Sequence, residues 1–174
     1  VRTLVKRDRN HPCVVFYSLF NEEPLQNTIE GKRIFKRMRS EVEKLDDTRF
    51  IMGAINGVSE AENGTALEMD ITGINYAINT IEDFHKKYPN QPIIGAENNS
   101  TLSTRGCYLT DMNKRVLACY DEERGRWGQT AKETWEIFRD KPYISGMFTW
   151  TGFDYRGEPT PFKYPAVSSQ FGVM

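Results

Sequence analysis

The chain contains the segment Cys13-Val-Val-Phe-Tyr-Ser-Leu-Phe-Asn-Glu22, an apolar run that ends in an acidic residue. A second run of this kind is Pro92-Ile-Ile-Gly-Ala-Glu97. Short runs rich in Val and Ile predict strands that are buried on both faces, as in a parallel sheet. Glu22 and Glu97 would then lie at the C-terminal ends of two different strands.

Strand-like and helix-like segments alternate along the rest of the chain. Three further segments have the pattern of strands: 49–54, 71–75 and 143–151. Apolar residues at helical spacing predict a helix from about Thr28 to Leu45. Thr80 is predicted to cap a short helix that runs to Tyr88, and the capping box Thr130-Ala-Lys-Glu133 predicts another helix. The alternation indicates an α/β fold with a parallel sheet and crossover helices.

The positions of the two glutamates suggest a chemistry. Parallel α/β barrels keep their active sites at the C-terminal ends of the strands. Glu22 and Glu97 would face each other across the mouth of such a barrel. Paired carboxylates at one site cleave glycosidic bonds. The long connection from Asn98 to Gln129 follows Glu97 directly, and we interpret it as an elaborated loop at the same mouth.

Aromatic and polar residues gather after the last predicted strand, in Phe148-Thr-Trp-Thr-Gly-Phe-Asp-Tyr-Arg-Gly-Glu-Pro159. Aromatic rings suit the C–H face of a sugar, while Asp154 and Arg156 suit its hydroxyls. A tightly packed turn stabilised by aromatic contacts is the alternative interpretation for Phe153 and Tyr155. The segment favours a carbohydrate as the substrate.

The bulk composition gives no support to other classes of partner. The 174 residues include 23 basic and 24 acidic ones, for a net charge of −1, and no Lys/Arg block stands out. Composition therefore gives no case for nucleic acid or for an anionic membrane surface. No apolar stretch approaches membrane-spanning length. The length is sufficient for a single domain with a sizeable core.

The cysteines and histidines suggest no metal site. Cys13, Cys107 and Cys119 are odd in number and lack C-x-x-C spacing, so we interpret them as free thiols, with Cys13 packed in a strand. The spacing of Cys, His and carboxylates indicates no metal site, and no cofactor is expected. The compartment is left open between bacterial periplasm and cytoplasm, and the oligomeric state is open as well.

The segment from Arg9 to Glu22 resembles the acid/base signature of glycoside hydrolase family 2, the β-galactosidase family. Four more motifs resemble the family's motifs and follow in its order: Asp47-Thr-Arg49, Asp70-Ile-Thr-Gly-Ile-Asn-Tyr76, Pro92-Ile-Ile-Gly-Ala-Glu97 and Trp150-Thr-Gly-Phe-Asp-Tyr-Arg-Gly-Glu-Pro-Thr-Pro161. The resemblance implies that residues 1–174 are one incomplete catalytic (β/α)8, or TIM, barrel domain, strands four to eight with their helices. Three strands and the N-terminal β-sandwich domains of the parent chain would be missing, and the chain expressed alone is expected to be inactive.

The resemblance also implies roles for individual residues. Glu22 resembles the general acid/base, and Glu97 the nucleophile that forms a glycosyl-enzyme. Asn21 resembles the residue that contacts the sugar 2-hydroxyl, and Tyr76 the tyrosine that hydrogen-bonds the nucleophile. Trp150 resembles the platform under the sugar.

Two residues depart from the family pattern. The family usually has Trp where Tyr17 stands and Gly where Phe20 stands. Tyr17 keeps an aromatic body that the strand can accommodate, whereas Phe20 is expected to narrow the sugar pocket. Glu23 lies beside Glu22, but the pattern assigns the acid/base role to the residue after Asn21.

The resemblance leads to a substrate hypothesis. Retaining hydrolysis of a terminal β-galactoside is expected, because the last motif is more typical of the galactosidases and the Asn-x-Lys pattern of β-glucuronidases is absent from the sequence. The alternatives are another family 2 activity, β-mannosidase or β-glucuronidase, and a non-catalytic carbohydrate-binding or structural fragment.

Overall fold

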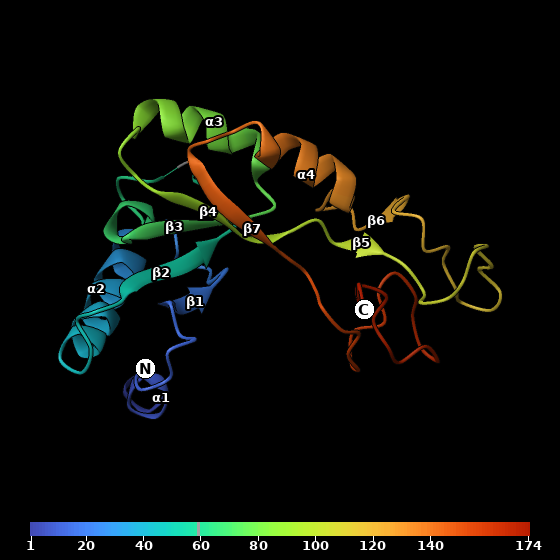
Figure 1. The fold of residues 1–174 in the computed structure, drawn as a ribbon, viewed down its shortest axis with the longest axis horizontal. Coiled ribbons are helices and arrows are strands. Elements are labelled where there is room, and N and C mark those ends of the chain that lie inside the picture. Colours follow the sequence, from blue (N-terminus) through green and yellow to red (C-terminus); the bar gives the residue numbers. More distant parts are fainter. Residues whose placement is uncertain (59) are drawn as a thin grey trace. The chain divides into compact units, whose positions relative to one another are not determined.

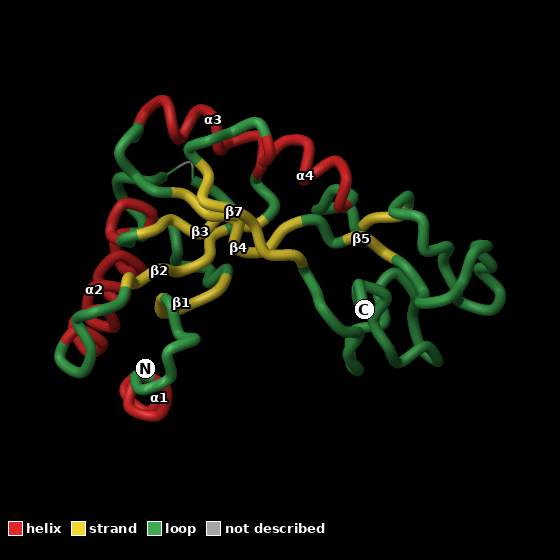
Figure 2. The backbone as a smooth tube through the Cα atoms, viewed as in Figure 1, coloured by secondary structure: helices red, strands yellow, loops and turns green. Residues whose placement is uncertain are grey.

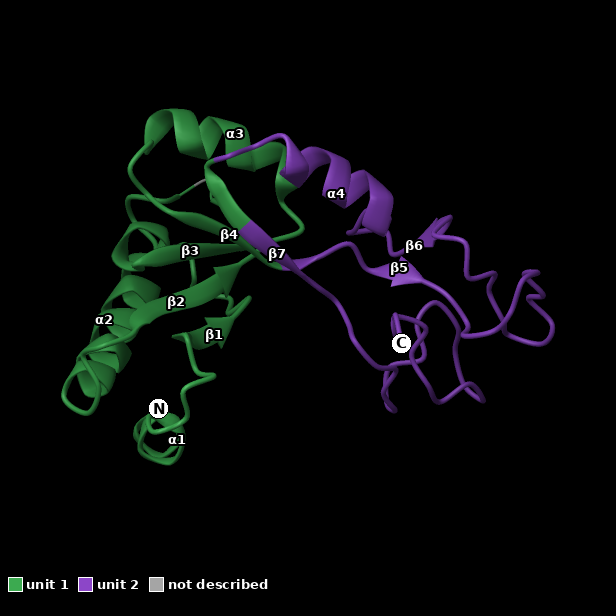
Figure 3. Cartoon of the chain, in the orientation of Figure 1, with its two compact units in different colours: residues 1–96, 143–145 green, residues 97–142, 146–174 purple. Residues whose placement is uncertain are grey.

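The structure is a computed structural model that describes residues 1–58 and 60–174. Ser59 lies outside the described residues; the sequence predicts a polar loop over residues 57–64, which contains it. The chain divides into two compact units (Figure 3). Unit 1 comprises residues 1–96 and 143–145, and unit 2 comprises residues 97–142 and 146–174. The prediction of a single domain stays a prediction.

Unit 1 contains strands that alternate with helices (Figures 1 and 2). Its elements are α1 (Arg2–Asp8), β1 (Phe16–Asn21), α2 (Ile29–Glu43), β2 (Phe50–Ile55), the 3-10 helix η1 (Ala66–Glu68), β3 (Ile71–Asn75), α3 (Ile78–Lys87) and most of β4 (Ile93–Asn98). Within the described residues the sheet has the order β1-β2-β3-β4-β7, and β7 (Ile144–Thr149) begins in unit 1. β2 pairs in parallel with both β1 and β3. Parallel strands end at the same edge of a sheet, so the C-terminal ends of β1, β2 and β3 lie together.

Helix α2 forms where the sequence pattern predicts it. The Thr28 hydroxyl accepts a hydrogen bond from the Gly31 amide at 3.1 Å and caps the helix. Phe35 and Val42 are buried on one face, and α2 contacts β1. A side chain at Gly31 would come within 1.9 Å of the Leu25 carbonyl, so only glycine allows this close approach.

The core of unit 1 consists of aliphatic side chains from the strands and the helices. The most completely buried of them are Val5, Val42, Ile51, Ile55, Ile74, Ile81 and Ile93. Burying one Val or Ile side chain contributes about 1.5–3 kcal/mol to folding. Four of these side chains lie on β2, β3 and β4, so their burial stabilises the sheet.

A buried carboxylate connects the end of α2 to β1 and β2. Asp46 accepts hydrogen bonds from the Thr48 hydroxyl at 2.6 Å, the Thr48 amide at 3.0 Å and the Tyr17 hydroxyl at 2.9 Å, and it pairs with Arg49. These hydrogen bonds, of which the one from the Thr48 hydroxyl has the largest effect, hold the pKa of Asp46 well below its usual range. Tyr17 is 3% exposed, which confirms that the strand accommodates it.

Two local predictions in unit 1 are wrong. β1 begins at Phe16, and Cys13 is exposed outside it, because the Arg49 guanidinium binds the Val14 carbonyl at 2.7 Å and holds this segment away from the ladder. α3 begins at Ile78, two residues before the predicted cap. The Thr80 hydroxyl donates to the Ala77 carbonyl at 2.7 Å, so Thr80 lies in the first turn instead of capping the helix.

The first strand is also less buried than predicted. Ser18 in the middle of β1 is exposed, whereas all of β2 except Phe50 is buried. Among the described residues, β1 lies at the end of the sheet order, with β2 as its neighbour. The apolar run therefore marks the strand correctly but not its burial on both faces.

Unit 2 has fewer regular elements. Strands β5 (Thr101–Leu102) and β6 (Glu123–Arg124) pair in antiparallel fashion within the long predicted loop. Helix α4 (Ala131–Arg139) begins with the predicted capping box, in which the Thr130 hydroxyl and the Glu133 carboxylate each bind the other's amide. In the described part of the chain, no helix has the length and apolar character required to cross a bilayer.

Candidate active site

The backbone at Glu22 is shaped by an irregularity in β1. The pairing of β1 with β2 shifts register between Ser18 and Asn21, as in a β-bulge. Such bulges re-aim side chains next to active sites. Glu22 follows with φ 50°, a left-handed conformation that costs a non-glycine residue about 1–3 kcal/mol. Its amide donates to the Ala54 carbonyl at 2.9 Å, so Glu22 is held at the end of β2.

Each carboxylate oxygen of Glu22 accepts a hydrogen bond from an asparagine amide. Asn75 Nδ2, at the end of β3, lies 3.0 Å from Glu22 Oε1. Asn56 Nδ2, directly after β2, lies 3.3 Å from Glu22 Oε2. Gln26 binds Asn56 in turn, at 2.6 Å from Nε2 to Oδ1. The ends of three adjacent strands thus orient this half-buried carboxylate.

Asn21 belongs to the same group. Its Oδ1 accepts a hydrogen bond from Asn75 Nδ2 at 2.9 Å, while the residue is exposed to solvent. The structure therefore brings together Asn21 and Glu22, which are both predicted site residues. Sequence reasoning missed Asn56 and Asn75, although each stands at the end of an apolar strand as Glu22 does.

Tyr76 follows Asn75 with φ 53°. A bulky residue in this conformation is a genuine outlier, and such strain gathers at functional sites. Glu97 is half-buried near the end of β4. Glu22 and Tyr76 belong to unit 1 and Glu97 to unit 2. The Glu22–Glu97 spacing and the bond from Tyr76 to Glu97 stay predictions.

In unit 2, Trp150 packs against an apolar cluster and is half-buried. The cluster consists of Leu102, Leu117 and Phe171, with Tyr155 and Phe162 packed on it beside Trp150. The Trp150 amide donates to the Asn98 carbonyl at 3.1 Å, which ties it to the strand that carries Glu97. The peptide bond from Trp150 to Thr151 is cis.

Tyr155 connects the tryptophan to a further acidic residue. Its ring meets that of Trp150 edge-on at 5.7 Å, and its hydroxyl donates to Glu158 Oε2 at 2.5 Å. Burial and the hydrogen bond to Glu158 raise the pKa of Tyr155 to about 12, and the charge of Glu97 adds to the shift. Tyr155 is therefore a neutral hydrogen-bond donor at physiological pH, which the sequence interpretation had not assigned.

The other two predicted sugar-binding residues also lie in unit 2. Asp154 Oδ1 accepts hydrogen bonds from the Ser169 hydroxyl, the Phe171 amide and the Gly172 amide at 2.7–2.9 Å. This carboxylate thus anchors the segment 169–172. Arg156 is exposed and bridges Ser168 through the backbone. Their contacts to sugar hydroxyls stay predictions.

Phe20 does not occupy the position that was expected of it. Its ring meets Phe35 of α2 edge-on at 5.8 Å, and a methyl group added at Gly53 would come within 2.2 Å of it. Phe20 also lines a groove of about 260 Å³ with Ile34 and Met38 of α2. The ring packs between sheet and helix, whereas the Glu22 carboxylate binds the strand-end amides.

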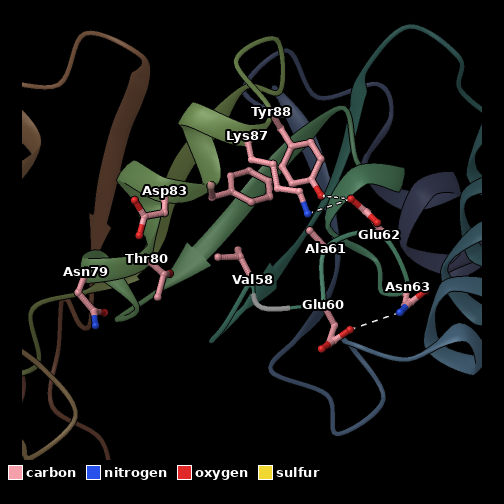
Figure 4. A pocket seen from close by; sticks show the side chains of 11 residues that line it. Val58, Glu60, Ala61, Glu62, Asn63, Asn79, Thr80, Asp83, Lys87 and Tyr88 are labelled. Carbon is pink, nitrogen blue, oxygen red and sulfur yellow. Dashed lines mark hydrogen bonds and ion pairs between the residues drawn. The ribbon is translucent and has the colours of Figure 1, made fainter.

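A separate hollow of about 530 Å³ lies between α3 and the loop after β2 (Figure 4). Glu62 there binds both Lys87, at 2.9 Å, and the Tyr88 hydroxyl, at 2.8 Å. These bonds fasten the loop to the end of α3. Within residues 1–58 and 60–174, no group of three or more His, Cys, Asp or Glu side chains is arranged to hold a metal ion.

The chain is similar to known proteins of one glycosidase family. The family description "Glycosyl hydrolases family 2, TIM barrel domain" matches residues 1–166. The β-galactosidase BoGH2A of Bacteroides ovatus is 32% identical over 221 aligned residues, which cover 98% of this chain and 26% of that protein. A putative β-glucuronidase of Formosa agariphila is 29% identical, over 91% of this chain and 17% of that protein. The chain thus spans about a quarter or less of the length of these two relatives.

Solved structures share the fold. A family 2 member from Bacteroides cellulosilyticus superimposes with a TM-score of 0.75 at 25% identity and covers 98% of this chain and 20% of that one. The β-glucuronidase of Ruminococcus gnavus gives a TM-score of 0.73 at 18% identity, over 99% of this chain and 31% of that one, a likeness of fold alone. The predicted family and the predicted partial barrel are confirmed: the chain belongs to glycosyl hydrolase family 2 and forms part of its TIM barrel domain.

Proposed function

We propose that the full-length protein is a retaining glycosidase for terminal β-galactosides, with Glu22 as general acid/base and Glu97 as nucleophile. The observation that carries the proposal is the Glu22 carboxylate, which lies at a strained strand end with one amide donor on each oxygen. Strand ends of this kind hold the catalytic groups of parallel barrels. The β-galactosidase of Bacteroides ovatus, 32% identical, supports the choice of sugar.

The reaction has two steps. Protonated Glu22 donates its proton to the glycosidic oxygen while a carboxylate oxygen of Glu97 attacks the anomeric carbon, and the alcohol leaves. The Glu22 carboxylate then removes a proton from water, whose oxygen attacks the same carbon and releases Glu97. Two inversions give net retention. The mechanism requires carboxyl groups about 5–5.5 Å apart.

Other residues would bind the sugar. Asn21 hydrogen-bonds the 2-hydroxyl, and Trp150 stacks on the C–H face of the ring. Tyr76 donates to Glu97 and keeps the nucleophile in place. Asp154 and Arg156 contact the remaining hydroxyls.

A second family 2 activity, β-glucuronidase, is favoured by one observation: the Formosa relative, 29% identical, is described as a putative β-glucuronidase. The two sugars differ in the configuration at C4 and in the carboxylate that replaces the C6 hydroxymethyl group of galactose. Turnover of nitrophenyl β-galactoside, β-glucuronide and β-mannoside by the full-length protein separates them. Faster turnover of the glucuronide or the mannoside would overturn the choice of galactose but not the mechanism.

The mechanism is tested with variants of the full-length protein. Glu97→Ala should lose about 10⁴-fold or more in kcat on every β-glycoside, because no covalent intermediate forms. Glu22→Ala should still accept dinitrophenyl glycosides in the first step, because a good leaving group needs little protonation, and azide should accelerate its turnover. Glu23→Ala is the matched control, since Glu23 is the exposed neighbour of Glu22, and its activity should stay near that of the unmodified protein.

A 2-fluoro glycoside provides the direct assignment. The trapped sugar should reside on the peptide that contains Glu97, as identified by mass spectrometry. A label on another peptide, or equal losses in Glu22→Ala and Glu23→Ala, would contradict the roles. A protein that binds galactosides without turning them over would support the non-catalytic alternative.

A further inference from the structure

Asn75 connects two residues of the proposed site through one amide group. The residue ends β3 and is 0% exposed. Its Nδ2 lies 2.9 Å from Asn21 Oδ1 and 3.0 Å from Glu22 Oε1. An amide NH2 group has two protons, so Asn75 can donate one to each acceptor.

The position of Asn75 makes this contact specific. β3 is separated from β1 by β2 in the sheet, so the bonds reach across one strand end. Asn56, at the end of that intervening strand, binds the other carboxylate oxygen at a longer 3.3 Å. Asn56 is exposed and Asn75 is buried. A buried hydrogen bond is electrostatically stronger than one in water, so Asn75 dominates the orientation of Glu22.

The backbone conformation gives a second reason for these hydrogen bonds from Asn75. Glu22 and Tyr76, the residue after Asn75, both have left-handed φ values, 50° and 53°. Strained conformations persist only where the surroundings over-determine them. Of the described residues, none binds Asn75 Oδ1, which is also buried. The Asn75 side chain therefore directs its amide protons to Asn21 and Glu22, while its carbonyl oxygen has no partner among the described residues.

We propose that Asn75 is the positioning residue that aligns the proton donor Glu22 with the leaving oxygen and Asn21 with the sugar 2-hydroxyl. The inference rests on the proposed function. Proton transfer depends on a short, directed hydrogen bond, and a displacement of about 1 Å can lower a rate about a hundredfold. Loss of the Asn75 amide should therefore weaken two contacts that belong to different parts of the sugar.

The experiment uses Asn75→Ala in the full-length protein and a series of aryl β-galactosides. We expect kcat/KM to fall about 10- to 100-fold for phenyl galactoside, whose departure requires protonation, and less than about threefold for dinitrophenyl galactoside. The preference for a galactoside over its 2-deoxy analogue should also shrink, because Asn21 is less well held. Asn79→Ala is the control, since Asn79 is an exposed asparagine in the first turn of α3, and it should change neither quantity.

Asn75→Asp provides the second variant if Asn75→Ala does not fold. It keeps the side-chain size, replaces the donor by a carboxylate oxygen and places a negative charge beside Glu22. Asn75→Asp should show the same leaving-group dependence as Asn75→Ala, with a larger loss of kcat/KM on phenyl galactoside. Equal losses on phenyl and dinitrophenyl galactosides in the folded variant would overturn the inference and indicate a structural role.

Failure of this inference can be distinguished from failure of the proposed function. If Glu22→Ala shows the leaving-group dependence and Asn75→Ala does not, only the inference is wrong. If neither variant shows it, or the protein does not turn over β-glycosides, the proposed function is wrong.

Discussion

The two proposed catalytic carboxylates belong to units with different construction. In unit 1, Glu22 is oriented by amides 34 and 53 residues away in sequence, which the parallel sheet brings to one edge. In unit 2, the hydrogen bonds of Tyr155 and Asp154 join residues that are closer in sequence. Tyr155 binds Glu158 three residues later, and Asp154 binds the backbone 17 and 18 residues later. The Glu22 carboxylate is thus positioned by the order of the strands, whereas Tyr155 and Asp154 lie in a loop segment beside the apolar cluster.

The difference predicts where substitutions are felt. In unit 1 the hydrogen bonds between strand ends act on Glu22, the proposed proton donor, so changes there should appear in the leaving-group dependence. In unit 2 the apolar cluster packs against Trp150, the proposed platform, so changes there should appear in sugar binding and in stability.

Apart from the proposed catalytic glutamates, the largest effect is expected at Trp150, the proposed platform. Trp150→Ala should cost on the order of 3 kcal/mol or more in transition-state binding, because the indole covers much of the sugar face. The measurement is kcat/KM on nitrophenyl β-galactoside. Tyr155→Phe is the comparison variant, since it keeps the ring that meets Trp150 edge-on and removes only the hydroxyl, with its hydrogen bonds to Glu158 and Trp150. A loss in Trp150→Ala that matches that of Tyr155→Phe would show that the indole acts as core packing.

Phe20→Ala should affect stability without affecting the sugar. Loss of the ring that packs on Phe35 should lower the free energy of unfolding by about 2–3 kcal/mol, because the site is only half-buried. Urea denaturation measures this loss. KM for β-galactosides should stay within about twofold, because Phe20 packs on α2 and is not expected to contact the sugar. A change in KM at constant kcat would require the loss of a contact that the bound substrate makes throughout the reaction. A large change in KM at unchanged stability would restore the view that Phe20 narrows the pocket.

Asp154→Ala should destabilise unit 2 by about 1–3 kcal/mol, because three donors to Oδ1 lose their acceptor. Asp154→Asn keeps a carbonyl oxygen at this position and should therefore destabilise unit 2 less than Asp154→Ala does. Protease sensitivity of the segment 169–172 measures the local effect. If both variants kept this segment protected but lost galactoside binding, the sugar contact would be the main role of Asp154.

A pH-dependent effect of similar size is expected at Asp46 in unit 1. Hydrogen bonds lower the pKa of Asp46 in the folded state, and the one from Thr48 has the largest effect. The stability it contributes is therefore full above the unfolded-state pKa of about 3.9 and is lost as the pH falls toward the folded-state value. Asp46→Asn should lower the free energy of unfolding by about 1–3 kcal/mol at pH 7. The difference from the unmodified protein should shrink below about pH 4; a constant difference from pH 7 to pH 3 would contradict this explanation.

The sequence alone determined features that depend on neighbouring residues. The cap at Thr28 and the capping box at Thr130 follow from side chains within three residues of the helix start. β3 occupies the predicted residues 71–75, and β2 is displaced by one residue, because short apolar runs need no distant partner to be recognised. The family motifs likewise predicted site roles for Asn21 and Glu22, which are consecutive in the sequence.

Only the tertiary structure revealed the group around Glu22. In the sequence, Asn75 is one polar residue at the end of a predicted strand. Its two hydrogen bonds exist because β1, β2 and β3 are parallel and adjacent. The same applies to Phe20, whose ring direction depends on the register shift in β1 and on the space above Gly53. Caps and periodicity are local, whereas strand order and register bring together residues far apart in the chain, so the hydrogen bonds that orient Glu22 follow only from the folded sheet.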